Sequence, residues 1–477
     1  MKKFLWIIPV ISVFCIYSIA FNNYFVYDDF IWLYRAKTLG QNWKQIVSLD
    51  VIYFDPLIYL MFLVDYSIAG LNPVWYHTID LIVHAFNAYL VYKFAKMLAC
   101  DEKAGLYGSI LFASSFAIAD AVLWSSSRVD LVSVMFSLGS LIQFLKYLRT
   151  DKTRYQLLSC LLFILALGAK GTPVVMPFML IWLIIMEKKP LRRYMSLVPF
   201  VMLVTLYFAL LMFASHNIAK QTIDLHLNIR NFCLALSEFF VPERYVAILN
   251  PYISATVFAL LLITSSFLRF YSGPSAIKLL YSPNHRIYFA SVGFALIGGG
   301  VLQLLEQWFN RLYPKAATTV TVLFLAGIVV LCAIEVRKRN QIWEYVGVAT
   351  QSAIKGLISH RDKIVEGGVV GLVQFPGSDG FMSPMIKLYL GLNEITTVQF
   401  NNGVGMIKDQ DLLEKAEKSS FFMLKKLGNN IVTYDLSDQF KKLLIDCRQA
   451  KLNPSVPEFK EECKTIAMQL TQKIVKP

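Results

Sequence analysis

The feature that most constrains this chain is a succession of long apolar runs. A helix needs about 20 largely apolar residues to cross a bilayer. Ten runs of this kind or slightly shorter lie between residues 4 and 336. They cover 4–21, 74–98, 104–124, 129–148, 155–167, 172–186, 197–214, 252–270, 286–305 and 317–336. The pattern predicts a polytopic α-helical membrane protein.

Composition agrees with this prediction. Hydrophobic residues make up 56% of the chain and charged residues 16%, against about 45–50% and 25% in soluble domains. These values exclude a disordered chain, a coiled coil, a collagen and a disulfide-rich module. The net charge of +14 comes largely from residues that border the apolar runs. It therefore indicates membrane topology and contact with anionic lipids, not nucleic-acid binding.

Three runs have more than one interpretation. The first, 4–21, is interpreted as an uncleaved helix, with a signal peptide as the alternative. The shorter runs 56–69 and 231–241 suit helices that lie at the interface or enter the membrane partway.

Basic residues orient the bundle. Clusters of Lys and Arg follow the second, fourth and sixth runs, so those loops are predicted to be cytoplasmic. The segments 22–55, 125–128, 168–171 and 215–230 then lie outside. If 231–241 does not cross, ten spans result and the C-terminus is cytoplasmic, as Arg337, Lys338 and Arg339 favour. If 231–241 crosses, eleven spans result and the C-terminus is outside.

After about residue 340 charges become frequent and no apolar span remains. Strands are predicted at 368–375, 395–400, 420–424 and 430–434, and helices at 383–390 and from residue 458. The chain is thus expected to form a membrane domain, 1–340, and a small α/β soluble domain, 341–477. Within the membrane domain, residues 22–73 are the first outer loop.

Four groups of polar residues could carry chemistry. The pair Asp28 and Asp29 follows the first span, where two adjacent carboxylates are costly to dehydrate. Further groups are a one-sided stripe in the second span, an outer turn with two carboxylates and an arginine, and scattered outer cations. The stripe is His77, Asp80, His84 and Asn87; the turn holds Asp120, Arg128 and Asp130; the cations include Lys170, Arg230 and Arg286.

Each group also has a plainer interpretation. Asp28 and Asp29 could begin a solvated loop, and Arg128 could pair with a neighbouring carboxylate at the surface. The stripe suits a hydrogen-bonded packing network, with a metal site as an open alternative. Single cations could simply extend to the interface.

Taken in order, these residues resemble the GT-C glycosyltransferases, and in particular bacterial relatives of protein O-mannosyltransferases and TMTC-type proteins. The likeness covers about residues 1–300. It is carried by the segments 24–30, 70–73, 76–77, 84, 120–124, 128–131, 169–170, 286–288 and 291–293.

The resemblance implies a GT-C-like bundle of about ten to eleven transmembrane helices that uses polyprenyl-phosphate sugars. It implies that Asp28 is the general base, that Asp29 supports the acceptor or a metal, and that Asp120 is a further catalytic residue at the family's second acidic position, where relatives more often carry Glu. Other residues implied are Lys170, Arg286, Arg128 and Arg230 at the donor phosphate, and His77, Asp80, His84, Asp55 and Tyr288 along the substrate cavity. No cofactor is implied with certainty; a divalent metal at Asp28, Asp29 and Asp120 stays an alternative.

Two positions depart from the family pattern. The chain has Asp55-Pro56 where relatives usually have Arg-Pro, and Lys170-Gly171 where they usually have Lys-Glu. The resemblance predicts a multi-pass protein of the cytoplasmic membrane with its active site outside. Because such families often keep their C-terminal domain outside, it also favours eleven spans, against the charge rule. Its partners would be the lipid-linked sugar, membrane lipids and a protein, lipid or glycan acceptor. The alternatives are a transporter or flippase of a lipid-linked glycan and a catalytically inactive scaffold.

Overall fold

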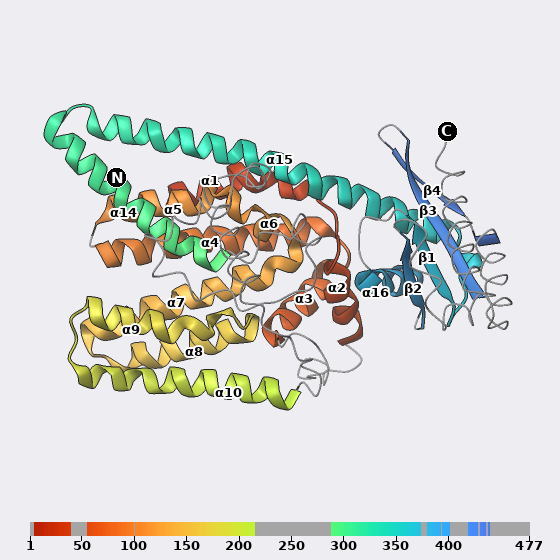
Figure 1. Cartoon of the computed structure of the whole chain (residues 1–477), viewed down its shortest axis with the longest axis horizontal. Coiled ribbons are helices and arrows are strands. Elements are labelled where there is room, and N and C mark those ends of the chain that lie inside the picture. Colours follow the sequence, from red (N-terminus) through yellow and green to blue (C-terminus); the bar gives the residue numbers. More distant parts are fainter. Residues whose placement is uncertain are drawn as a thin grey trace, which may run out of the picture. The chain divides into compact units, whose positions relative to one another are not determined.

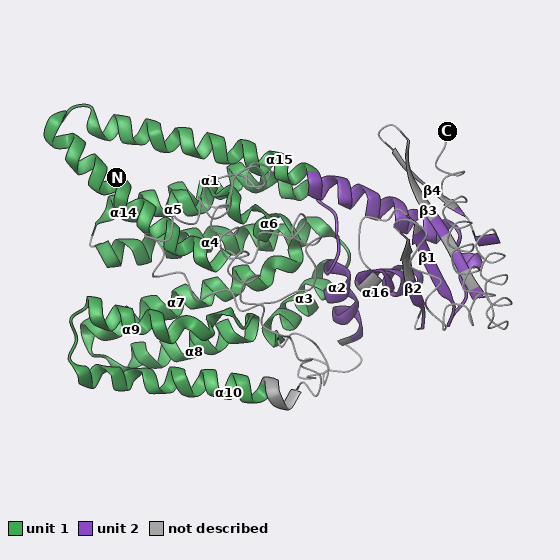
Figure 2. Ribbon diagram, in the orientation of Figure 1, with its two compact units in different colours: residues 1–22, 42–341 green, residues 23–41, 342–477 purple. Residues whose placement is uncertain are grey.

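The computed structural model describes residues 4–39, 55–99, 101–214, 288–373, 379–392, 394–400, 418–427, 430–435 and 437–438 (Figure 1). The chain divides into two compact units (Figure 2). The first unit contains residues 1–22 and 42–341, and the second contains 23–41 and 342–477. Residues 23–41, which the sequence analysis assigns to the membrane domain, therefore group with the C-terminal residues.

The first unit is helical. Its helices are α1 (Ile7–Tyr17), α3 (Pro56–Ala69), α4 (Pro73–Ala99), α5 (Glu102–Ser114), α6 (Ala119–Leu123), α7 (Arg128–Thr150), α8 (Thr153–Ala169), α9 (Met176–Met186), α10 (Val198–Ala214), α14 (Tyr288–Leu312) and the first half of α15 (Ala317–Ser359). Short 3-10 turns are η2 (Ser18–Asn22), η4 (Phe116–Ile118), η5 (Ser125–Ser127), η6 (Thr172–Val175) and η7 (Leu191–Leu197).

Most of the predicted spans form helices, which confirms the polytopic helical class. Nine of the ten runs coincide with these helices and turns, while 252–270 and the run 231–241 lie outside the described residues. Four described helices are long and apolar enough to cross a membrane alone: Ser125–Thr150, Leu191–Leu210, Tyr288–Leu312 and Ala317–Ser359. The bent pair Glu102–Ser114 and Phe116–Leu123 would be a fifth. By length and composition alone, the described helices therefore account for fewer crossings than the ten to eleven that the sequence predicts.

Helices α5 and α14 approach each other closely because glycines lie at their contact. A Cβ atom at Gly299 would lie 2.5 Å from the backbone nitrogen of Gly108 and 2.6 Å from the carbonyl oxygen of Ala104. A Cβ atom at Gly108 would lie 2.7 Å from the carbonyl oxygen of Ala295. Small residues permit this backbone approach in membrane helices. The contact fixes α14 against the bundle and so positions its first residues.

The far end of the same helix pair is tied by a polar cluster. The Glu306 carboxylate on α14 accepts bonds from Lys103 Nζ at 2.6 Å, Tyr107 Oη at 2.8 Å and Thr318 Oγ1 at 2.6 Å. Glu306 is 18 residues from Tyr288, or about 27 Å along the helix. The sequence analysis did not identify this cluster, whose partners come from α5 and α15.

The second unit contains a four-stranded sheet with the order β2-β1-β3-β4. Its strands are β1 (Val369–Val373), β2 (Thr396–Phe400), β3 (Ser419–Leu427) and β4 (Asn430–Asp435). The strand β1 pairs in parallel with β2 and β3, and β3 pairs antiparallel with β4. The unit also contains the helices α2 (Asp29–Leu39) and α16 (Asp379–Leu390), the second half of α15 and the 3-10 turn η10 (Arg361–Lys363). The predicted strands and the helix at 383–390 are all present; the tail from residue 458 lies outside the described residues.

Candidate functional site

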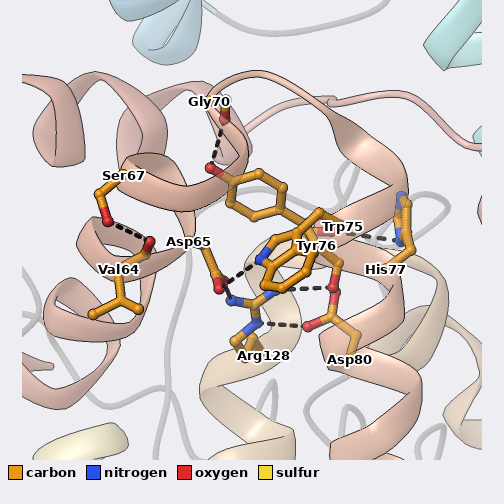
Figure 3. Close-up of polar contacts among 10 residues, drawn as sticks. Val64, Asp65, Ser67, Gly70, Trp75, Tyr76, His77, Asp80 and Arg128 are labelled. Atoms are coloured by element: carbon orange, nitrogen blue, oxygen red, sulfur yellow. Dashed lines mark hydrogen bonds and ion pairs between the residues drawn. The ribbon is translucent and has the colours of Figure 1, made fainter.

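Arg128, at the start of α7, is the centre of a buried ionic cluster (Figure 3). Its side chain is fully buried and donates to Asp80 at 2.6 Å, to Asp65, and to the Tyr76 carbonyl oxygen at 3.0 Å. Asp65 also accepts a bond from the Trp75 indole nitrogen at 3.0 Å. The three charged groups come from α3, α4 and α7, so the cluster ties these helices together. In this structure the guanidinium faces carboxylates and a carbonyl oxygen inside the protein.

The polar stripe of α4 is buried along its whole length. His77, Asp80, His84 and Asn87 are each at most 1% exposed. His84 Nδ1 lies 2.7 Å from Tyr288 Oη, and the Asn87 amide donates to the same hydroxyl at 3.0 Å. The stripe therefore connects α4 to the first turn of α14, where Tyr288 lies. Ser125 Oγ lies 3.5 Å from His77 Nδ1, so the N-terminal end of the stripe contacts the turn between α6 and α7.

Asp120 forms a two-pronged ion pair with Arg339, on α15. Arg339 Nε donates to one carboxylate oxygen at 2.8 Å and Nη2 to the other at 2.6 Å. Asp120 is almost fully buried, whereas the Arg339 side chain is 23% exposed. Such fork geometry is characteristic of guanidinium with carboxylate. Arg339 follows the apolar part of α15, so the pair lies where that helix leaves its apolar stretch.

Asp130 pairs in turn with Lys170, at 2.6 Å. Asp130 is buried, and the Lys170 side chain is 22% exposed. The turn from 115 to 130 thus contains two buried carboxylates, Asp120 and Asp130, and each forms an ion pair with a partly exposed cation.

The neighbouring residue, Gly171, lies directly against α10. A Cβ atom at this position would lie 2.6 Å from the Tyr207 hydroxyl of α10. A side chain such as Glu would have to displace that hydroxyl.

The acidic pair belongs to the second unit, and its two members differ. Asp28 is exposed and caps α2, because its carbonyl oxygen accepts the amides of Ile31 and Trp32 at 2.9 and 3.2 Å. Asp29 is buried, and its carboxylate accepts the Val26 amide at 2.8 Å. Partial enclosure by protein raises the pKa of Asp28, and the charge of Arg35 opposes this shift. The two carboxylates therefore have separate environments, with Asp28 facing outward.

The remaining predicted residues are placed as follows. Asp55 is buried at the N-cap of α3, without a side-chain capping bond. Arg230 and Arg286 lie outside the described residues. Among the residues that the structure describes, no three His, Cys, Asp or Glu side chains come together as a metal-ligand group. Asp28 and Asp29 lie in one unit, and Asp120 and Lys170 in the other.

Two charged residues in the ion pairs of the candidate site were missed by the sequence analysis. Asp65 is a single carboxylate within the apolar helix α3, and an ionisable group in such a place implies a buried partner. Arg339 was read only as part of a basic cluster that orients the membrane. Their partners, Arg128 and Asp120, are 63 and 219 residues away, so no local pattern indicates the pairing.

Comparison with known proteins supports the resemblance drawn from the sequence. No family model matches the chain. It is 32% identical over 97 residues to protein O-mannosyl-transferase TMTC2 of Mus musculus, and 32% identical over 118 residues to TMTC3 of Homo sapiens. Tmtc1 of Drosophila melanogaster is 27% identical over 119 residues. These matches cover 20%, 24% and 25% of this chain. They span only 12–14% of the length of those proteins.

Two solved structures are similar in outline. ArnT from Cupriavidus metallidurans, bound to undecaprenyl phosphate, matches with a TM-score of 0.48 at 12% identity, over 88% of this chain and 92% of its own. The Archaeoglobus fulgidus oligosaccharyltransferase, tethered to an acceptor peptide, matches with a TM-score of 0.47 at 10% identity, over 89% of this chain and 69% of its own.

Proposed function

We propose that this chain is a membrane glycosyltransferase that moves a monosaccharide from a polyprenyl-phosphate donor to an acceptor hydroxyl on the outer side of the cytoplasmic membrane. The similarity to O-mannosyl-transferases supports the reaction class. The observation that carries the proposal is the turn from 115 to 130, where buried Asp120 and Asp130 hold the partly exposed cations Arg339 and Lys170. A phosphate donor needs cations of this kind close to the membrane surface.

Asp28 is proposed as the general base. An acceptor hydroxyl is a weak nucleophile at neutral pH, so a carboxylate must remove its proton as the oxygen attacks. Asp28 is the exposed member of the pair, and its raised pKa brings it nearer to the working range of a base. The Asp29 carboxylate accepts a hydrogen bond from the Val26 backbone amide, and Asp29 is therefore proposed as a positioning residue for the turn.

The reaction is a single displacement. The acceptor oxygen forms a bond to the anomeric carbon while the bond from that carbon to the phosphate oxygen breaks, which inverts the anomeric centre. The leaving group is the polyprenyl phosphate, whose negative charge is balanced by cations. Lys170 and Arg286 are proposed for this role, as in the sequence analysis; of the two, Lys170 is among the described residues. Arg128 is not included, because its guanidinium is fully buried among Asp65, Asp80 and a carbonyl oxygen.

The direct test is release of the lipid phosphate from radiolabelled polyprenyl-phosphate sugars by the purified protein. The wild-type chain should release it in the presence of an acceptor, and Asp28→Asn should abolish release while leaving thermal unfolding unchanged. Asp362→Asn, an exposed carboxylate of the same unit, is the matched control and should keep full activity. Near-normal turnover by Asp28→Asn would refute the assignment of the base.

The alternatives give other results in the same assay. An inactive scaffold would bind the donor without releasing phosphate. A transporter would move a lipid-linked glycan across a reconstituted bilayer and leave the sugar–phosphate bond intact.

A further inference from the structure

A cluster of cations surrounds one tyrosine at the turn between α7 and α8, at the other end of α7 from the 115–130 turn. Arg154 Nη2 donates to the Tyr155 hydroxyl at 3.1 Å, and the guanidinium carbon lies 4.8 Å from the centre of the Tyr155 ring. Lys146 Nζ lies 5.5 Å from the same ring centre. Lys152, the N-cap residue of α8, is close enough for its charge to act on the same hydroxyl. Three cations therefore converge on Tyr155, and these four residues form the Tyr155 cluster.

The turn that carries the Tyr155 cluster is fixed by other contacts. Asp151 has a φ of +57°, and its amide donates to the Tyr147 carbonyl oxygen at 2.9 Å. Arg193 of η7 forms an ion pair with Asp151 and donates to the Tyr147 hydroxyl at 2.9 Å. The backbone thus brings the three cations together without a carboxylate between them.

Neighbouring cations of the same region have carboxylate partners. Arg149 pairs with Glu187 at 2.7 Å, and Arg193 pairs with Asp151. The three cations of the Tyr155 cluster form no ion pair with any carboxylate that the structure describes. Positive charges gathered in this way repel one another, and a bound anion relieves the repulsion. The fold therefore distinguishes this cluster from the other basic residues, which the sequence alone treats alike.

The Tyr155 cluster offers hydrogen-bond donors to a ligand. Guanidinium and ammonium groups carry N–H donors and no acceptor. The Tyr155 oxygen accepts the bond from Arg154, so its own O–H is left to donate. Lys152 and Arg154 are exposed, and Lys146 and Tyr155 are half-buried, so a ligand can reach all four. Phosphate oxygens are acceptors that suit such a set of donors.

An apolar stripe continues from the cluster along α8. Leu158 and Leu161 follow Arg154 by four and seven residues and so share its face of the helix. They are 39% and 53% exposed, within the run 155–167 that the sequence predicts to cross the membrane. A phospholipid fits both parts, because its phosphate would meet the cations while its acyl chains follow the leucines. A free phosphate would use only the first part.

We propose that the Tyr155 cluster binds the headgroup of an anionic phospholipid, whose acyl chains lie along Leu158 and Leu161. The headgroup phosphate accepts hydrogen bonds from the three cations and from the Tyr155 hydroxyl. The cluster lies between two apolar runs, 129–148 and 155–167, which places it at the depth of lipid headgroups. This site does not depend on the proposed function.

Native mass spectrometry of the purified full chain measures the binding directly. The protein is stripped of lipid in detergent and titrated with phosphatidylglycerol or phosphatidylethanolamine of the same chain length. The second lipid carries its own ammonium group beside the phosphate, so the first should bind about tenfold or more tightly. Equal affinities for the two lipids would overturn the proposal.

Two double variants remove the same charges from different places. Lys146→Gln with Arg154→Gln removes a lysine and an arginine of the cluster, and Lys188→Gln with Arg192→Gln removes an exposed lysine and arginine of the next basic loop. A hydrogen bond to a charged group corresponds to roughly tenfold in affinity. The cluster variant should therefore bind phosphatidylglycerol at least about tenfold more weakly, and the loop variant should stay within about twofold of wild type. Equal losses would indicate diffuse attraction and overturn the site.

Tyr155→Phe tests the hydroxyl while keeping the ring. It should weaken phosphatidylglycerol binding about fivefold, and Tyr194→Phe, a half-buried tyrosine of the next basic loop, is the matched control. The variants should unfold at the wild-type temperature in the absence of lipid, because none of the substituted side chains is fully buried. Wild-type affinity in Tyr155→Phe would exclude the hydroxyl from the site.

Competition with inorganic phosphate separates a lipid from a soluble anion. Phosphate in large excess over the lipid should leave phosphatidylglycerol bound, because phosphate gains nothing from the leucine stripe. Displacement of the lipid at comparable concentrations would identify a soluble phosphate as the ligand and overturn the lipid assignment. None of these measurements uses sugar transfer, so they stand whether or not the chain proves to be a transferase.

Discussion

Gly299 gives the sharpest test of the packing between α5 and α14, because three adjacent glycines on α14 have different surroundings. A methyl group at Gly299 would meet backbone atoms at 2.5 and 2.6 Å, which cannot move without shifting a helix. At Gly298 the neighbour at 2.8 Å is a Leu111 methyl carbon, which can rotate away. At Gly300 nothing lies within 4 Å. The three positions therefore separate the steric cost from the change in helix propensity.

Two terms set the expected magnitudes. Replacing Gly by Ala inside a helix favours the helix by about 1 kcal/mol, and this gain is common to all three variants. Overpacking a tight contact costs about 1–3 kcal/mol, and this cost applies fully only at Gly299. We expect Gly300→Ala to stabilise the protein, Gly298→Ala to be nearly neutral, and Gly299→Ala to be destabilised relative to Gly300→Ala by about 1–3 kcal/mol.

The measurement is thermal unfolding of the purified variants in one detergent, with the midpoint followed by circular dichroism. Because α14 begins with Tyr288, Gly299→Ala should also weaken the contacts of Tyr288 with His84 and Asn87. Equal midpoints for Gly299→Ala and Gly300→Ala would refute the close helix contact.

Three further predictions concern the charged groups. Arg128→Met leaves Asp65 and Asp80 buried without their cation and should destabilise the protein by about 3–5 kcal/mol, as measured by thermal unfolding. Adding Asp65→Leu and Asp80→Leu should recover much of this loss. An unaltered unfolding midpoint in the single variant would contradict a stabilising role of the buried ionic cluster. Arg339→Lys cannot donate to both carboxylate oxygens of Asp120 as the guanidinium does. It should lower kcat for transfer about tenfold, which corresponds to the loss of one charged hydrogen bond. Full activity would show that the two-pronged Asp120–Arg339 ion pair is dispensable for transfer. Enclosure raises the pKa of Asp28, and the charge of Arg35 opposes the shift. The pH profile of kcat/KM should therefore have an acid limb, with activity lost as the pH falls through a value above the ordinary Asp pKa of about 4. Arg35→Gln should move this limb to higher pH, and a limb that does not move would exclude Asp28 as its source.

The sequence was sufficient for features that depend on local pattern. Apolar runs of helical length predicted nearly all described helices of the first unit, and short apolar segments in the more polar C-terminal part predicted the four strands. The i, i+3, i+7, i+10 spacing of His77, Asp80, His84 and Asn87 predicted a single face, and all four side chains are buried. In each case the information lies within one element.

Long-range pairing could not be predicted in this way. Asp65 and Arg339 each occur where a plainer explanation is available, in an apolar helix and in a basic cluster. Their roles depend on partners that only the folded chain brings near. The grouping of residues 23–41 with the C-terminal unit has the same origin, since the hydrogen bond between the Tyr24 and Tyr389 hydroxyls joins residues that show no relation in sequence.

The continuity of α15 has a consequence for how the length of this chain can vary. Within the second unit, the Trp343 ring packs against the Tyr27 ring, and a Cβ atom at Gly347 would lie 3.1 Å from the Tyr24 backbone nitrogen. Trp343 and Gly347 are four positions apart on one uninterrupted helix, so they lie on the same helical face. A single residue inserted or deleted between them would turn one position by about 100° relative to the other, which would preserve one contact and misdirect the other. Insertions and deletions among natural homologues should therefore avoid this stretch and accumulate in the loops.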